Sequence, residues 1–230
     1  MIDLSALERE ALTLSLQVAS WCLIAGLPLA LGLGVLLARA QFAGKAVIHA
    51  LVHLPLVLPP VATGYLLLMV FGRKGPLGAA LEDWFGIVIA FRWTGAVVAA
   101  IVMALPLMVR PIHLALEAVD RDLEEAARTL GAGRLAIFAT VTLPLAMPGI
   151  IAAAILGFAK ALGEFGATIT FVANIPGETR TLPLAIHTAL QIPGEEGSAL
   201  RLTALALAIS VSAVIASELI ARRIARRIAA

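Results

Sequence analysis

The sequence predicts an all-α integral membrane protein with five transmembrane helices. The 230-residue chain is 61% hydrophobic and only 14% charged, whereas soluble domains usually carry about 25% charged residues. Its mean hydropathy is +1.00. A transmembrane helix needs about 20 mostly apolar residues, and five segments meet this requirement: Leu12–Ala38, Val47–Phe71, Trp93–Val109, Val141–Leu162 and Leu202–Ile220.

The first span carries Gly26, Gly32 and Gly34, small positions at which another helix can approach closely. Asp3, Glu8 and Glu10 stand before it, where a secretory signal would carry a basic region. We therefore expect this span to be retained.

Prolines interrupt the second span. Pro55, Pro59 and Pro60 predict kinks, because each removes a backbone donor. The freed carbonyls and Thr63 are candidates for lining a cavity, and simple packing kinks are the alternative. Pro144 and Pro148 predict a similar kink at the start of the fourth span.

Two apolar segments are too short to cross the membrane alone. Thr181–Gln191 has eleven residues and suits a re-entrant or interfacial segment. Phe85–Phe91 either lengthens the third span or lies at the surface.

The distribution of Lys and Arg predicts an outer N-terminus and an inner C-terminus. The inner segments then hold ten of these residues, namely Arg39, Lys45, Arg110, Arg121, Arg128, Arg134, Arg222, Arg223, Arg226 and Arg227. The outer segments hold six, namely Arg9, Arg73, Lys74, Arg92, Arg180 and Arg201. We expect an outer segment at 1–10, a transmembrane domain at 11–221 and a basic inner tail at 222–230.

Motifs for catalysis or cofactor binding are missing from the sequence. It contains no P-loop, no H-E-x-x-H and no G-x-S-x-G. The single Cys22 excludes a disulfide framework. His49 and His53 are four residues apart, but partners at the membrane interface are the better interpretation than a metal. We predict no catalytic, cofactor-binding or metal-binding residues.

The longest charged interval lies between the third and fourth spans. Asp120 or Asp122 can begin a helix there, and Asp122 with Glu125 has capping-box spacing. Gly131 suits the left-handed residue after its end. An apolar stripe runs along the predicted helix through Leu123, Ala126, Ala127 and Leu130.

The charge of this helix argues against burial of the stripe in the membrane surface. Between Asp120 and Arg128 four acids outnumber two bases, and the inner leaflet attracts basic segments. Docking into the groove of a partner protein fits better, and a plain structural loop is the alternative.

The same interval resembles the EAA motif of bacterial ABC-importer permeases. Glu125-Ala126-Ala127 is followed after three residues by Gly131 and after nine more by Val141-Thr142-Leu143-Pro144, with Val141 where Ile is usual. The resemblance implies a type I importer fold with cytoplasmic coupling helices in loop 116–140, which dock on a separate ATP-binding subunit. Glu125, Ala126, Ala127, Leu130, Gly131 and Pro144 are then the docking residues.

A second stretch narrows the family. The segment from Lys160 to Thr181, KALGEFGATITFVANIPGETRT, resembles molybdate permeases, which commonly have Arg where this chain has Lys160. Sulfate permeases share its Gly-Glu-aromatic-Gly core. The alternatives within the family are therefore tungstate and sulfate.

Lys160 and Glu164 are four residues apart and can face each other on a helix. An ion pair that neutralises two costly charges, a gating role and direct anion contact are all open. Gly163 and Gly166 mark a hinge or a helix end. The candidate pathway residues are Lys160, Gly163, Glu164, Phe165, Gly166, Pro59, Pro60 and Thr63.

The resemblance also implies partners. They are a second copy of the chain, two cytoplasmic ATPase subunits that carry ATP and Mg, and a periplasmic molybdate-binding protein, assembled in a bacterial inner membrane. An ion-gradient-driven secondary transporter is the alternative class. It needs intramembrane ion sites, for which only Lys160 and Glu164 qualify, and usually internal repeats, which the sequence lacks.

Overall fold

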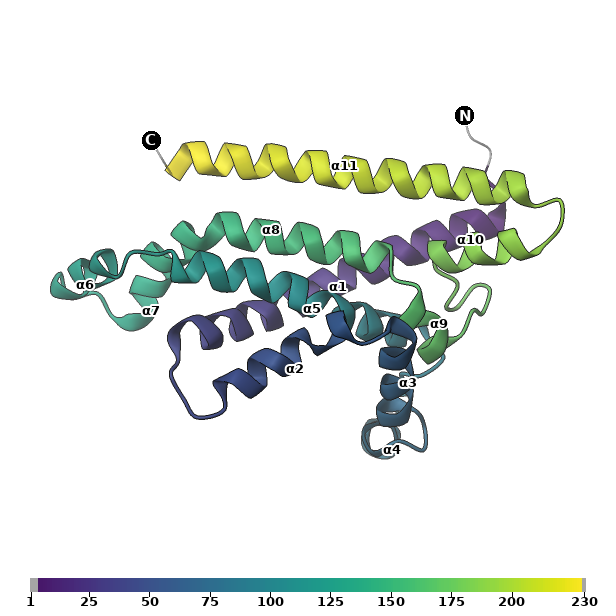
Figure 1. The fold of residues 1–230 in the computed structure, drawn as a ribbon, viewed down its shortest axis with the longest axis horizontal. Coiled ribbons are helices and arrows are strands. Elements are labelled where there is room, and N and C mark those ends of the chain that lie inside the picture. The colour runs from purple at the N-terminus through teal and green to yellow at the C-terminus, as the bar shows by residue number, and fades with distance from the viewer. Residues whose placement is uncertain (1–3, 229–230) are drawn as a thin grey trace.

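The computed structural model describes the backbone of residues 4–228 and the side chains of residues 4–215. All regular elements in this part of the chain are helices (Figure 1). In order they are α1 (Ala6–Arg39), α2 (Lys45–Val57), α3 (Pro60–Phe71), α4 (Pro76–Phe85), α5 (Trp93–Glu117), α6 (Arg121–Thr129), α7 (Arg134–Ile137), the π-helix η1 (Phe138–Thr142), α8 (Leu143–Leu162), α9 (Gly166–Val172), α10 (Leu182–Gln191) and α11 (Glu196–Ile228).

Three long helices, α1, α5 and α8, pack against one another and form the core. Small residues allow the close approach. A Cβ added at Gly34 would lie 2.6 Å from Ile112 of α5, and one added at Gly157 of α8 would lie 2.5 Å from Met108. A Cβ added at Gly26 has a similar contact at 3.0 Å, but no atom of the described residues lies within 4 Å of one added at Gly32. Within the described chain, the expected close approach thus holds for Gly26 and Gly34 and is wrong for Gly32.

Four helical stretches of the described chain are long and apolar enough to cross a membrane: Ala6–Arg39, Trp93–Glu117, Arg134–Leu162 and Glu196–Ile215. The expected second span is not one helix. It consists of α2 and α3, and the chain direction bends by 118° between them. The count is therefore five only if this broken pair is one span.

The break lies where two consecutive prolines follow Leu58. Neither Pro59 nor Pro60 has an N–H to continue the hydrogen bonding of α2, and Pro60 begins α3 as its first residue. Pro55 stays inside α2 without ending it. The sequence correctly placed a distortion here but underestimated it.

The two short apolar segments differ in structure. Leu182–Gln191 forms the separate helix α10, close to the predicted bounds. Phe85–Phe91 does not lengthen the third span, because α4 ends at Phe85 and Gly86 turns the chain with φ +66°. Residues 86–92 are then non-helical up to α5.

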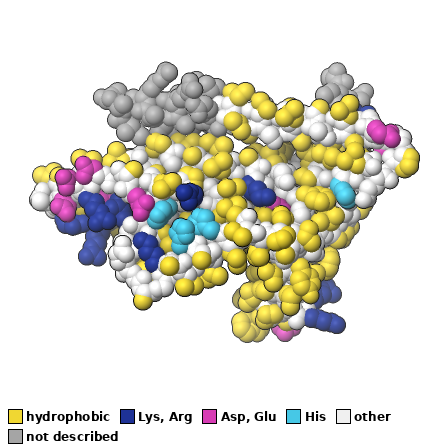
Figure 2. Space-filling model, in the orientation of Figure 1, with side chains coloured by type: hydrophobic (Ala, Val, Ile, Leu, Met, Phe, Trp, Pro, Cys, Tyr) yellow, Lys and Arg dark blue, Asp and Glu magenta, His cyan; other side chains and the backbone are white. Residues whose placement is uncertain are grey.

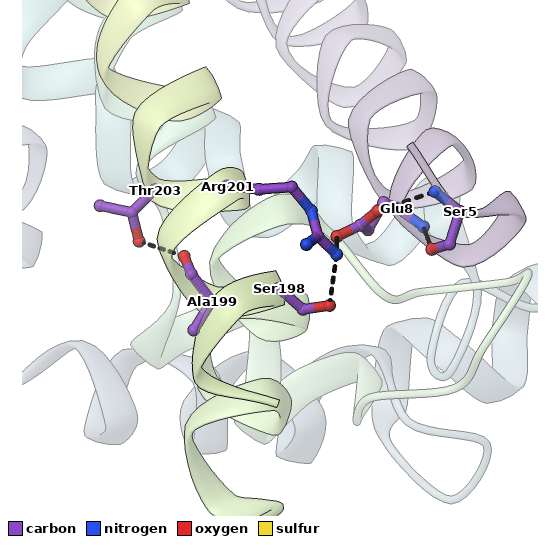
Figure 3. Close-up of polar contacts among 6 residues, drawn as sticks. All are labelled: Ser5, Glu8, Ser198, Ala199, Arg201 and Thr203. Atoms are coloured by element: carbon purple, nitrogen blue, oxygen red, sulfur yellow. Dashed lines mark hydrogen bonds and ion pairs between the residues drawn. The ribbon is translucent and has the colours of Figure 1, made fainter. Parts of the chain in front are cut away.

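An ion pair joins the start of α1 to the start of α11 (Figure 3). Ser5 and Glu8 form a capping box at the beginning of α1. Glu8, which is 4% exposed, also accepts a hydrogen bond from Arg201 at 3.0 Å, and Arg201 donates to Ser198 at 2.9 Å. In the predicted basic tail 222–230, the backbone is helical to Ile228, and its side chains lie outside the described residues.

Candidate functional site

Helix α6 begins at Asp120 and ends in a glycine turn. The Oδ1 atom of Asp120 accepts a hydrogen bond from the N–H of Asp122 at 3.0 Å. Asp120 is therefore the N-cap, and the capping box expected for Asp122 is wrong. At the other end Gly131 has φ +87°, and the N–H groups of Gly131 and Ala132 donate to carbonyls of the last helical turn. This Schellman motif confirms the conformation predicted for Gly131.

The apolar stripe of α6 is not covered by any described part of this chain. None of the helix residues is buried. Leu123 is 49% exposed and Leu130 is 88% exposed. Ala126 and Glu125 are exposed as well, and Ala127 is half-buried. An amphipathic helix with a solvent-facing apolar stripe and a rigid terminal turn is the geometry that a partner groove accepts.

The opposite side of α6 is tied to the transmembrane helices by Glu124. Its Oε1 atom accepts hydrogen bonds from Arg39 of α1 at 2.7 Å and from Thr142 of η1 at 2.5 Å. The Glu124 side chain is only 16% exposed. A partly buried carboxylate oxygen with two donors, one of them charged, fixes the orientation of α6, and the sequence analysis did not single it out.

A π-helix leads from this tie into α8. Its last residue, Thr142, is 3% exposed, and Pro144 follows in the first turn of α8, where a proline is tolerated. π-Helical turns are uncommon and concentrate at functional sites. The Val141–Pro144 part of the motif therefore builds the junction between α6 and α8.

At the far end of α8, Lys160 and Glu164 form the predicted pair. The Nζ atom of Lys160 lies 2.5 Å from Oε2 of Glu164. The other carboxylate oxygen accepts a hydrogen bond from the N–H of Ala167 at 3.0 Å. Glu164 is almost fully buried, and Lys160 is 27% exposed. The Glu164 carboxylate thus neutralises the charge of Lys160 and also accepts a hydrogen bond from the first turn of α9.

The glycines beside this pair mark a helix end. Gly163 is the C-cap of α8, and α9 begins at Gly166. A Cβ added at Gly166 would lie 2.7 Å from Cβ of Pro60, and one added at Gly64 would lie 2.5 Å from the carbonyl of Ala167. Two glycines therefore allow α3 and α9 to touch backbone to backbone.

The remaining pathway candidates lie around this contact. Pro59 precedes α3. Thr63 is 5% exposed, and its hydroxyl has no hydrogen-bond partner among the described residues. Thr63 lines a hollow of about 190 Å³ between α2, α3 and α5, whose other lining residues are all apolar. The ring of Phe165 lies 5.0 Å from that of His187. One copy of the chain therefore provides an apolar hollow here, not a polar conduit.

The predicted residues form two groups at opposite ends of α8 (Figure 1). The docking residues precede or begin α8, whereas the Lys160–Glu164 pair and its glycines end it. A helix of 20 residues spans about 30 Å, which is the thickness of a bilayer core. The two groups of predicted residues therefore lie about one bilayer thickness apart.

Comparisons with known proteins agree with this arrangement. A family described as "Binding-protein-dependent transport system inner membrane component" matches residues 30–226. The chain is 56% identical over 215 residues to the "Molybdenum transport system permease protein ModB" of Escherichia coli (strain K12), covering 94% of each chain. It is 49% identical over 222 residues to the protein of the same name from Haemophilus influenzae, covering 96% of this chain and 97% of that one.

A solved structure shares the fold at low sequence identity. The crystal structure of a bacterial alginate ABC transporter in complex with an alginate pentasaccharide-bound periplasmic protein contains a chain that superposes with a TM-score of 0.71. The identity is 18%, and the match covers 97% of this chain and 80% of that one.

Proposed function

This chain belongs to the family of binding-protein-dependent transport system inner membrane components, and we propose that it forms the membrane pathway of an ATP-driven molybdate importer. The observation that carries the proposal is the solvent-facing stripe of α6, with Leu123 and Leu130 uncovered, in a chain 56% identical to a molybdenum permease. The family relation and the multi-pass helical fold favour a permease subunit. The inner membrane is its proposed location.

The motor lies on another chain in this proposal. An ATPase subunit receives α6 through Leu123, Leu130 and the exposed Glu125, and ATP and Mg bind to that subunit. This chain carries out no covalent chemistry. Its relatives are named as transport permeases, which fits a subunit that moves a solute without catalysing a reaction.

Two copies of the chain form the pathway between them. The hollow beside Thr63, among the predicted pathway residues, is otherwise apolar in one copy and cannot replace the hydration of an anion. A periplasmic oxyanion-binding protein delivers the substrate at the outer face. This fits the outer N-terminus predicted from the basic residues, and the alginate transporter was solved with a periplasmic protein.

Transport proceeds by alternating access. Closure of the ATPase dimer moves α6, and Glu124 passes the movement to α1 and η1 through Arg39 and Thr142. The rearrangement at the far end involves the junction of α8, α9 and α3. There, Lys160 cancels the Glu164 charge that would otherwise repel an approaching anion.

Uptake into proteoliposomes tests the proposal. The chain is reconstituted with its ATPase and binding-protein partners, and radioactive molybdate uptake is measured with ATP, without ATP, and with a proton gradient alone. We expect uptake only with ATP and the ATPase. Uptake driven by the gradient without the ATPase would instead establish a secondary transporter. Competition by unlabelled tungstate and sulfate ranks the three oxyanions.

A further inference from the structure

Basic side chains line a hollow of about 130 Å³ between α2 and α5. His49 and His53 come from α2, and Arg110 and His113 come from α5. Three apolar residues complete the wall, and no carboxylate lines it. Figure 2 shows histidine side chains gathered beside Lys and Arg side chains on the visible face.

The three imidazoles lie close together. The rings of His49 and His53 are stacked with centroids 4.3 Å apart, and the ring of His113 lies 6.4 Å from that of His49. Two helices that are separate in sequence thus bring their basic groups to one point.

Two of these histidines have one ring nitrogen engaged and one without a partner. His53 donates from Nδ1 to the carbonyl of His49 at 2.9 Å, because a carbonyl can only accept. The Nε2 atom of His113 lies 3.4 Å from the Glu117 carboxylate. The opposite nitrogens, Nε2 of His53 and Nδ1 of His113, are buried and have no hydrogen-bond partner in the part of the chain that the structure describes.

The surrounding charges favour an anion over a cation as the ligand. Arg110 is permanently charged, and Lys45 lies one helical turn before His49 on α2. Among the described residues, Glu117 is the one carboxylate that contacts the cluster, and it pairs with His113 at the edge. Protonated imidazoles beside Arg110 repel one another, and an anion among them removes that repulsion. No group of three His, Cys, Asp or Glu in the described chain is arranged to hold a metal ion.

We propose that this hollow binds a tetrahedral oxyanion group, held by Arg110 and by the protonated imidazoles of His53 and His113. The group is either a free oxyanion or the phosphate of an anionic lipid, since basic pockets between membrane helices bind such headgroups. The site lies between the start of α2 and the end of α5, next to the beginning of α6. It does not depend on which substrate the pathway carries.

Equilibrium binding to the purified full chain tests for a free anion. Radioactive molybdate and phosphate are the probes, between pH 8 and pH 6. We expect the dissociation constant for molybdate to be lower at pH 6 than at pH 8, because a proton taken up by an imidazole together with the anion adds a positive charge beside it. Arg110→Gln should weaken binding at least about tenfold, and His53→Gln with His113→Gln should remove the pH dependence. Arg73→Gln removes one positive charge from an exposed ion pair elsewhere and should bind as the unmodified chain does.

A second experiment tests whether the ligand is the phosphate of a lipid. The chain is extracted from vesicles that contain phosphatidylglycerol, and the retained lipid is counted by native mass spectrometry. Retention that is lost in Arg110→Gln but kept in Arg73→Gln supports the site with a lipid phosphate as its ligand. The proposal is overturned if the chain binds neither a free anion nor the lipid, or if Arg110→Gln and Arg73→Gln behave alike. It is also overturned if the hollow takes up Ni²⁺ or Zn²⁺ in place of anions.

Discussion

Glu164 is a buried carboxylate whose ion-pair partner is a single lysine. Replacing Lys160 with alanine leaves that charge uncompensated, and breaking a buried pair in this way costs about 3–5 kcal/mol. We therefore expect Lys160→Ala to lower the melting temperature of the purified chain and to reduce molybdate uptake. Lys74→Ala, which alters an exposed lysine, is the matched control. Unchanged stability and uptake in Lys160→Ala would show that the pair has no role.

Glu125 is exposed on α6 and makes no ion pair within the described chain, which leaves its carboxylate to a partner. We expect Glu125→Lys to abolish co-purification of the ATPase subunit, because the reversed charge faces the docking groove. Membrane insertion should be normal. Glu195→Lys makes the same charge change in an exposed loop between α10 and α11 and should retain the ATPase. Normal docking in Glu125→Lys would move the interface away from this residue.

The sequence could predict docking residues on α6, but it could not predict the Glu124 tie beside them. Glu124 and Glu125 are chemically identical neighbours, and the spacing to Gly131 singles out only Glu125. Which of the two faces Arg39 depends on the rotation of α6 against α1, and that contact joins residues 85 positions apart.

At the scale of elements, the Glu124 tie predicts a defect in coupling, not in assembly. In Glu124→Ala the exposed stripe of α6 is intact, so the ATPase should still bind. The link to Arg39 and Thr142 is lost, and we expect several-fold less molybdate transported per ATP hydrolysed. Thr142→Ser keeps the hydroxyl and should be near normal, whereas Thr142→Val should resemble Glu124→Ala. Loss of ATPase binding in Glu124→Ala would make the tie part of the docking surface itself.

The contact between α3 and α9 gives a second test at this scale. An alanine at position 166 would place its Cβ 2.7 Å from Pro60, and overpacking of this kind costs about 1–3 kcal/mol. We expect Gly166→Ala to lower the melting temperature and slow uptake. A Cβ added at Gly32 meets no atom of the described residues within 4 Å, so Gly32→Ala should be tolerated. Equal melting temperatures for the two variants would contradict this packing.

Some helices could be predicted from the sequence and others could not, because the sequence patterns that indicate them have different physical causes. Long apolar runs identified α1, α5, α8 and α11, because burial in lipid requires them whatever their neighbours. Consecutive prolines identified the distortion between α2 and α3, but a proline removes a hydrogen bond without dictating a direction. The 118° turn is instead accompanied by the packing of α3 on α9, a contact more than 100 residues away in sequence.

At the scale of the whole molecule, the predicted orientation can be tested by labelling. In a Cys22→Ser background, Gln41→Cys lies in the loop between α1 and α2, and Glu195→Cys lies in the loop between α10 and α11. Both positions are exposed. An impermeant maleimide should label position 195 in spheroplasts and position 41 only after the membrane is opened. The reverse pattern would invert the topology and place α6 outside.

The exposure of Leu130 also bears on how the cell handles this chain. A leucine that is 88% exposed at the end of a helix is a surface that chaperones and proteases recognise when no partner covers it. If the proposed ATPase covers Leu130, we expect a copy synthesised in excess of that ATPase to be degraded. The amount of transporter in the membrane would then be set by the scarcer subunit.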